Sequence, residues 1–129
     1  MAYKLIYATE AKPGAIVLID QIPCMVKSNN LSKTGKHGHA KCRIEALGLK
    51  DNKKRVFLKG GHEKLESPRI DKNKGQILSI QEETISLMDL RNFETIEIDL
   101  PEELKGKIHE GEQIEYWVIE GKNILRKKI

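Results

Sequence analysis

The side chains best equipped for chemistry gather in one basic segment, residues 27–41. Positions 21–44 contain no acidic residue, whereas lysine recurs throughout the segment. Gly35 and Gly38 enclose Lys36 and the residue after it, and glycine permits the positive φ of a tight turn. The sequence therefore predicts a cationic hairpin loop over residues 27–41 with Lys36 at its apex. An exposed lysine could contact phosphate oxygens or be covalently modified, although a solvated basic loop without a special role also fits.

Two enzyme patterns can be tested against this segment. A phosphate-binding P-loop requires glycine, four residues, Gly-Lys and then Ser or Thr, but Asn30 stands at the upstream glycine position and His37 follows Lys36. A lysine nucleophile requires a pocket or a cationic neighbour that lowers its pKa, and a hairpin tip supplies no pocket. The segment therefore predicts no catalytic residue, and no cofactor is expected.

Metal binding and base stacking have little support. The possible soft metal ligands are Cys24, His37, His39, Cys42, His62 and His109. None of them shows the spacing of a zinc site, so both cysteines are expected in the core, while His37 and His39 could share a weak contact. The six aromatic residues are scattered. Tyr116 and Trp117 are strand neighbours that should point to opposite faces, one core and one surface. Phosphate contacts through lysines are thus favoured over stacking.

Hydrophobic periodicity predicts strands in both halves of the chain, and hence an all-β fold. The first half should contain about five strands forming a small barrel, including 15–19, 24–27, 41–47 and 55–59. In the third of these, Cys42, Ile44 and Ala46 should face the core. The second half contains candidate strands at 76–80, 85–89, 96–100, 114–119 and 124–126. Because a short helix is expected at 101–106, between the third and fourth of these strands, the pattern is that of an OB-fold barrel.

A division into two domains, 1–68 and 69–129, is predicted where proline interrupts the strand pattern at Ser67-Pro68-Arg69. Residues 1–68 hold 13 Lys+Arg and 6 Asp+Glu, and residues 69–129 hold 10 and 13. The first half is therefore suited to a polyanion, although random scatter of surface charge is an alternative. No run of 18 apolar residues occurs, the first seven residues lack the apolar core of a signal peptide, and two cysteines cannot form a disulfide scaffold. A cytoplasmic protein without membrane contact is expected.

Residues 32–41, Ser-Lys-Thr-Gly-Lys-His-Gly-His-Ala-Lys, resemble the signature loop of translation initiation factor 5A. Residues 12–14, 22–26, 87–91 and 95–96 are similar to runs at the corresponding places of that family. The short stretch before the first strand resembles the archaeal branch. The resemblance implies an SH3-like N-terminal barrel, which would carry the loop, followed by an OB-fold domain.

The resemblance also implies that Lys36 is converted to hypusine or deoxyhypusine. Deoxyhypusine synthase would transfer an aminobutyl group from spermidine, using NAD. The factor, itself not an enzyme, would bind the ribosome near the exit site beside the peptidyl-tRNA, promote peptide bond formation and relieve stalling, for example at consecutive prolines. The residues expected to contact tRNA and rRNA are Lys33, Gly35, Lys36, His37, Gly38, His39 and Lys41.

Two other hypotheses remain open from the sequence. A general RNA-binding or RNA-chaperone module would use Lys36 as one basic contact among several. A small enzyme would use Lys36 as a nucleophile and would require an enclosed pocket around it.

Overall fold

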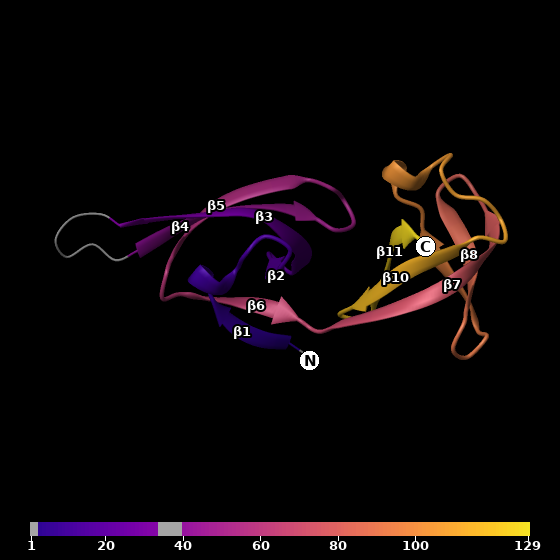
Figure 1. Ribbon diagram of the computed structural model, residues 1–129, viewed down its shortest axis with the longest axis horizontal. Coiled ribbons are helices and arrows are strands. Elements are labelled where there is room, and N and C mark those ends of the chain that lie inside the picture. The colour runs from indigo at the N-terminus through magenta and orange to yellow at the C-terminus, as the bar shows by residue number, and fades with distance from the viewer. Residues whose placement is uncertain (1–2, 34–39) are drawn as a thin grey trace. The chain divides into compact units, whose positions relative to one another are not determined.

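Strands dominate the structure, a computed structural model that describes residues 3–33 and 40–129 (Figure 1). The chain forms two compact units, Met1–Arg69 and Ile70–Ile129. The strands of the first unit are β1 (Tyr3–Tyr7), β2 (Ile16–Ile19), β3 (Ile22–Lys33), β4 (Ala40–Gly48), β5 (Lys54–Gly60) and β6 (Lys64–Pro68). Those of the second are β7 (Ile70–Ile80), β8 (Thr84–Asp89), β9 (Thr95–Asp99), β10 (Gln113–Ile119) and β11 (Lys122–Lys128). Two single 3-10 turns, η1 (Ala8–Glu10) and η2 (Glu102–Leu104), lie between strands. Within the described residues, no helix is long and apolar enough to cross a bilayer.

The first unit is built from two antiparallel sheets. One has the strand order β2-β3-β4-β5, and the other pairs β1 with β6. Alternation along β4 places Cys42, Ile44 and Ala46 on the inner face with 0% exposure, as the sequence predicts. The buried cluster of this unit comprises Ala8, Ala11, Val17, Val26, Cys42, Ile44 and Leu65.

β3 extends further than the sequence predicts. The pattern favours a short strand at 24–27 and a loop over 27–41, but strand pairing continues to Lys33↔Ala40, so the predicted extent of the loop is wrong. Polar residues continue the strand because β4 supplies backbone partners and because the side-chain amide of Asn29 donates to the carbonyl oxygens of Ala8 and Ala11, each at 2.9 Å. Pairing of β2 with β3 ends at Met25. Beyond it, no described strand pairs with the outer edge of β3.

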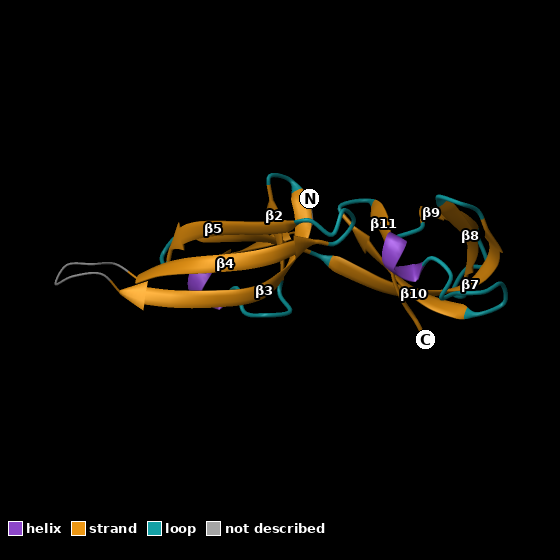
Figure 2. Cartoon of the chain, turned by 90° about the horizontal axis from the view of Figure 1, so that it is seen from above, coloured by secondary structure: helices purple, strands orange, loops and turns teal. Residues whose placement is uncertain are grey.

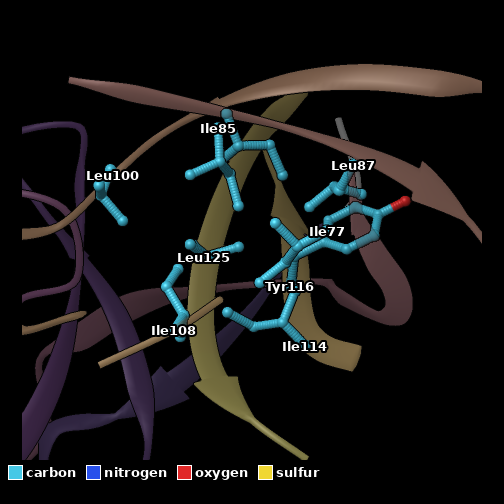
Figure 3. Packing of buried hydrophobic residues seen from close by; sticks show 9 residues of the cluster. Ile77, Ile85, Leu87, Leu100, Ile108, Ile114, Tyr116 and Leu125 are labelled. Atoms are coloured by element: carbon cyan, nitrogen blue, oxygen red, sulfur yellow. The ribbon is translucent and has the colours of Figure 1, made fainter. Parts of the chain in front are cut away.

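The second unit is a five-stranded antiparallel sheet with the order β11-β10-β7-β8-β9. Its inner face carries a hydrophobic cluster to which β7, β8, β10 and β11 all contribute (Figure 3). The cluster consists of Ile77, Ile85, Leu87, Ile98, Leu100, Ile108, Ile114, Tyr116 and Leu125. All five strands predicted here are present. The helix expected at 101–106 is only the three-residue turn η2, because Lys105 returns to extended backbone and Gly106 adopts a φ of +77°.

A buried carboxylate connects β8 to β10. Asp89, 2% exposed, accepts a hydrogen bond from the hydroxyl of Tyr116 and another, at 2.7 Å, from the backbone amide of Arg91. The ring of Tyr116 lies within the hydrophobic cluster and its oxygen points out of the cluster (Figure 3). The turn after β8 is therefore anchored to β10 by one side chain.

Candidate functional site

The segment with the chemically capable residues belongs to a long two-stranded hairpin. β3 and β4 run side by side from Cys24↔Gly48 to Lys33↔Ala40 (Figures 1 and 2). Residues 34–39 join the two strand ends. The predicted contact residues Gly35, Lys36, His37, Gly38 and His39 therefore lie outside the described residues, whereas the two lysines that flank them are described.

The end of the hairpin lies beyond the hydrophobic core. Leu31 is 55% exposed although its partner across the strands, Cys42, is completely buried. Ser32, Lys33 and Lys41, which follow toward residues 34–39, are exposed as well. The core thus ends near the pair Leu31↔Cys42, and in the last two pairs of the hairpin only Ala40 is partly buried.

The last described pair of the hairpin is held by a backbone hydrogen bond from outside the hairpin. Gly61, in the turn between β5 and β6, donates its N–H to the carbonyl oxygen of Ala40 at 2.7 Å. A Cβ at position 61 would lie 3.1 Å from Cγ2 of Thr9 and 3.3 Å from both Cβ and the carbonyl oxygen of Ala40. Only glycine therefore allows this close approach without displacing a neighbour.

Sequence reasoning missed the supporting roles of Gly61 and Asn29. Asn29 contacts residues 21 and 18 positions earlier in the chain. The contacts of both residues depend on tertiary packing. The surrounding sequence contains no local pattern that identifies them.

Positive charge is least neutralised at the end of the hairpin. Lys33 and Lys41 form no ion pair with any described residue. Arg43, further back on β4, bonds to Glu45 at 3.0 Å, and Lys54 lies 3.6 Å from the same carboxylate. These partners lower the pKa of Glu45, Arg43 having the largest effect. Lys33 and Lys41, which flank residues 34–39, are therefore available to an anionic ligand.

Neither cysteine belongs to a chemical site. Cys24 and Cys42 are both free thiols with 0% exposure, as the sequence predicts. Burial raises the pKa of each thiol, although Arg55 partly opposes this effect at Cys24. In the parts of the chain that the structure describes, no group of three or more His, Cys, Asp and Glu side chains could hold a metal ion.

Comparison with known proteins gives matches along nearly the whole chain. Residues 4–56 match the family model "Translation initiation factor 5A-like, N-terminal", and residues 69–126 match "Eukaryotic elongation factor 5A hypusine, DNA-binding OB fold". Translation initiation factor 5A of Methanosphaera stadtmanae is 43% identical over 116 residues, which cover 90% of this chain and 88% of the relative. The chain belongs to the translation initiation factor 5A family.

Other members agree with this assignment. The factor from Thermococcus kodakarensis is 37% identical over 126 residues, covering 95% of this chain and 93% of that protein. The solved structure of the Methanococcus jannaschii factor superposes with a TM-score of 0.88 at 34% identity and covers 99% of this chain and 96% of that one. The resemblance inferred from residues 32–41, its archaeal character and the all-β fold with a C-terminal OB domain are thereby confirmed. Like other members, the chain is a translation factor.

Proposed function

We propose that this translation factor acts on the ribosome through a hypusine or deoxyhypusine side chain at Lys36. It binds near the exit site beside the peptidyl-tRNA, steadies the acceptor end of that tRNA, and so promotes peptide bond formation and relieves stalling at sequences such as consecutive prolines. The observation that carries the proposal is the position of Lys36 in the family's signature segment, joined to a hairpin whose exposed end lies beyond the core.

The proposed modification changes both the reach and the charge of the side chain. Deoxyhypusine synthase transfers an aminobutyl group from spermidine to Lys36, using NAD. The product is longer and carries two amines, both charged near neutral pH. It can enter a narrow cleft lined by RNA and hydrogen-bond phosphates or ribose hydroxyls at two points.

The factor would then promote peptide bond formation on the ribosome by positioning the end of the peptidyl-tRNA. A tRNA end held in a reactive geometry lowers the barrier to peptide bond formation without proton transfer by the factor. The protein therefore needs no catalytic residue, metal or resident cofactor of its own. Its activity resides in the placement of one extended side chain.

The other residues of the segment support the modified side chain. Lys33 and Lys41, which lack ion-pair partners among the described residues, are placed to contact phosphates on either side. Gly35 and Gly38 provide backbone without a Cβ close to RNA, and His37 and His39 add polar contacts. An exposed hairpin end also suits the modifying enzyme, because its target lysine has to enter a synthase pocket.

The decisive test is substitution of Lys36 together with mass spectrometry of the protein from its native host. We expect the added aminobutyl mass on Lys36 in the native protein. Lys36→Arg keeps a positive charge but cannot accept the aminobutyl group, so this variant should fold normally and fail to stimulate translation of a polyproline-containing message.

The matched control is Lys33→Arg, which keeps both the charge and the modification site and should retain activity. An unmodified Lys36 in active native protein, or full activity of Lys36→Arg, would refute the proposal.

A second candidate function, a general RNA-binding module, is favoured by Lys33 and Lys41, which form no ion pair with a described residue. Under that hypothesis, Lys36→Ala would weaken RNA binding no more than Lys33→Ala or Lys41→Ala does. A measurement of RNA affinity for the three variants, made on modified protein, separates the two proposals.

A further inference from the structure

Basic residues in the second unit are concentrated on one part of its surface. Residues 70–129 contain 9 Lys+Arg and 13 Asp+Glu, a net negative balance. Even so, six of the nine basic residues lie on β7 and β11, the strands on either side of β10. Lys128 is one of these, but it is paired with Glu112 at 2.5 Å.

Four of the remaining basic residues lie on the same face of the sheet as Trp117, the only tryptophan of the chain, next to Trp117 itself or to Glu115. On the outer face, Trp117 of β10 lies opposite Lys72 of β7, and Glu115 lies between Lys74 of β7 and Lys127 of β11. Pairing with β11 is interrupted between Glu115 and Tyr116, which leaves Arg126 as an extra residue in β11. The Trp117 patch is defined here as Lys72, Lys74, Trp117, Arg126 and Lys127.

Trp117 holds two of these cations in place. The Nζ of Lys72 lies 5.0 Å and the Cζ of Arg126 4.5 Å from the centroid of the indole ring. Because only 8% of Trp117 is exposed, no base can stack on the ring, so the surface offers charge rather than an aromatic platform. The buried indole N–H has no hydrogen-bond partner among the described residues.

Two carboxylates, those of Glu103 and Glu115, act on the patch through Arg126, so its positive charge is only partly neutralised within the unit. On the face of the sheet that holds the four cations, β7, β10 and β11 carry one carboxylate, that of Glu115, and none of the four cations forms an ion pair with a described residue. Burial lowers the pKa of Arg126, an effect that Glu103 and Glu115 oppose. A partly desolvated guanidinium interacts more strongly with an anion than a fully hydrated one does.

The surface that usually binds nucleic acid in OB folds is acidic in this protein. That surface is formed by the second and third strands and the loops after the first and fourth strands, here β8, β9, residues 81–83 and residues 120–121. It carries Glu82, Glu83, Glu97, Asp99 and Glu120, and no Lys or Arg within those strands and loops. A polyanion would be repelled there and attracted to the Trp117 patch.

We propose that the Trp117 patch binds the phosphate backbone of RNA. That the polyanion is RNA rests on the proposed ribosomal function. Lys72 and Lys74 are two residues apart on one strand face, a spacing of about 6.7 Å, which is comparable with the separation of successive phosphates along a nucleic-acid strand. Binding of this kind is independent of base sequence and weakens as salt increases.

Trp117 also provides the measurement, since it is the only tryptophan. Its fluorescence should change when unmodified full-length protein is titrated with a short RNA duplex of arbitrary sequence. Lys74→Glu and Lys127→Glu alter the charge of the patch without removing a ring contact. Each should weaken the fluorescence-detected binding several-fold and reduce its salt slope by about one.

The control variant is Lys107→Glu, an exposed lysine of the same unit outside β7, β10 and β11, with the same change in net charge. It should bind RNA as the wild type does. Equal weakening by all three variants, or RNA binding detected by anisotropy of a labelled duplex with no change in Trp117 fluorescence, would overturn the proposal. So would stronger binding of polyglutamate than of RNA at the patch, because the partner would then be an acidic protein.

The experiment is independent of the proposed role of Lys36. Lys36→Arg should leave the fluorescence change intact, so failure of the Trp117 patch and failure of the hypusine proposal produce different results.

Discussion

Gly61 holds the first residue of β4 through its backbone, because its amide donates to the carbonyl oxygen of Ala40 and its missing side chain leaves room for Thr9. At the neighbouring Gly60, an added Cβ would meet nothing closer than 3.5 Å. The two glycines thus form a natural pair of positions for testing how closely the hairpin is packed against the turn after β5.

We expect Gly61→Ala to destabilise the first unit by about 1–3 kcal/mol, since the new methyl group overpacks a site bounded by Thr9 and by Cβ and the carbonyl oxygen of Ala40. Gly60→Ala should change the free energy of unfolding by less than about 0.5 kcal/mol. Urea unfolding of both variants is the measurement, and equal effects at the two positions would contradict this description of the packing.

The two cysteines should be chemically inert while the protein is folded. Both are fully buried, and burial raises the pKa of each thiol, so little thiolate forms near neutral pH. Iodoacetamide should label neither Cys24 nor Cys42 in native protein and should label both in denaturant, as mass spectrometry can show. Rapid stoichiometric labelling of the native state would be inconsistent with the buried positions.

At the scale of elements, the hydrogen bond between Asp89 and Tyr116 joins β8 to β10 and should make stability depend on pH at both extremes. Burial alone would raise the pKa of Asp89, but hydrogen bonds from Tyr116 and from the amides of Arg91 and Asn92 outweigh it, and the pKa is lowered. Burial, followed by the nearby carboxylate, raises the pKa of Tyr116 to about 12.

The two shifts act in opposite pH ranges. The contribution of Asp89 is present above its ordinary pKa of about 3.9 and is lost as pH falls through the lowered value in the folded protein. The contribution of Tyr116 is present below about pH 10 and is lost as pH rises toward 12.

Tyr116→Phe removes the donor and should cost about 1–3 kcal/mol at neutral pH, because Asp89 stays buried with one partner fewer. It should also abolish the alkaline loss of stability between about pH 10 and 12 that Tyr116 causes. Unfolding free energies measured across the pH range test both statements. If this variant lost as much stability as the wild type between about pH 10 and 12, other groups would have to cause that loss.

For the whole molecule, the strands with clear alternation and the OB pattern of the second unit could be predicted from sequence, since every second residue of β4 faces the core. On β10 the expectation of one core and one surface residue at Tyr116 and Trp117 is wrong, because both side chains are buried. The sequence pattern does not predict β1 and β6, because these two strands pair only with each other, from Tyr3↔Pro68 to Tyr7↔Lys64, and are separated by most of the first unit. The same limit applies to the Trp117 patch. Its members on β7 are more than 40 residues from those on β10 and β11, and they meet only through the register of the three strands.

The two units bring different charge patterns to one chain. Lys33 and Lys41 at the exposed end of the hairpin form no ion pair with a described residue, and the acidic second unit has four of its nine basic residues in the Trp117 patch. If each surface contacts RNA, their effects on affinity multiply when both can engage the same particle. Lys36→Arg on one side, and Lys74→Glu and Lys127→Glu on the other, separate the two contributions.

The unpaired outer edge of β3 has a consequence for solubility. Val26 still bonds to the backbone of Gly14 and Ala15, but past Val26 this edge has no partner strand among the described residues, which is the arrangement that invites edge-to-edge aggregation. Exposed Lys27 and Lys33 lie on that strand and repel an approaching copy of the chain. The positive charge of the hairpin would therefore also oppose association of this strand edge with a second copy of the chain and help to keep the protein in solution.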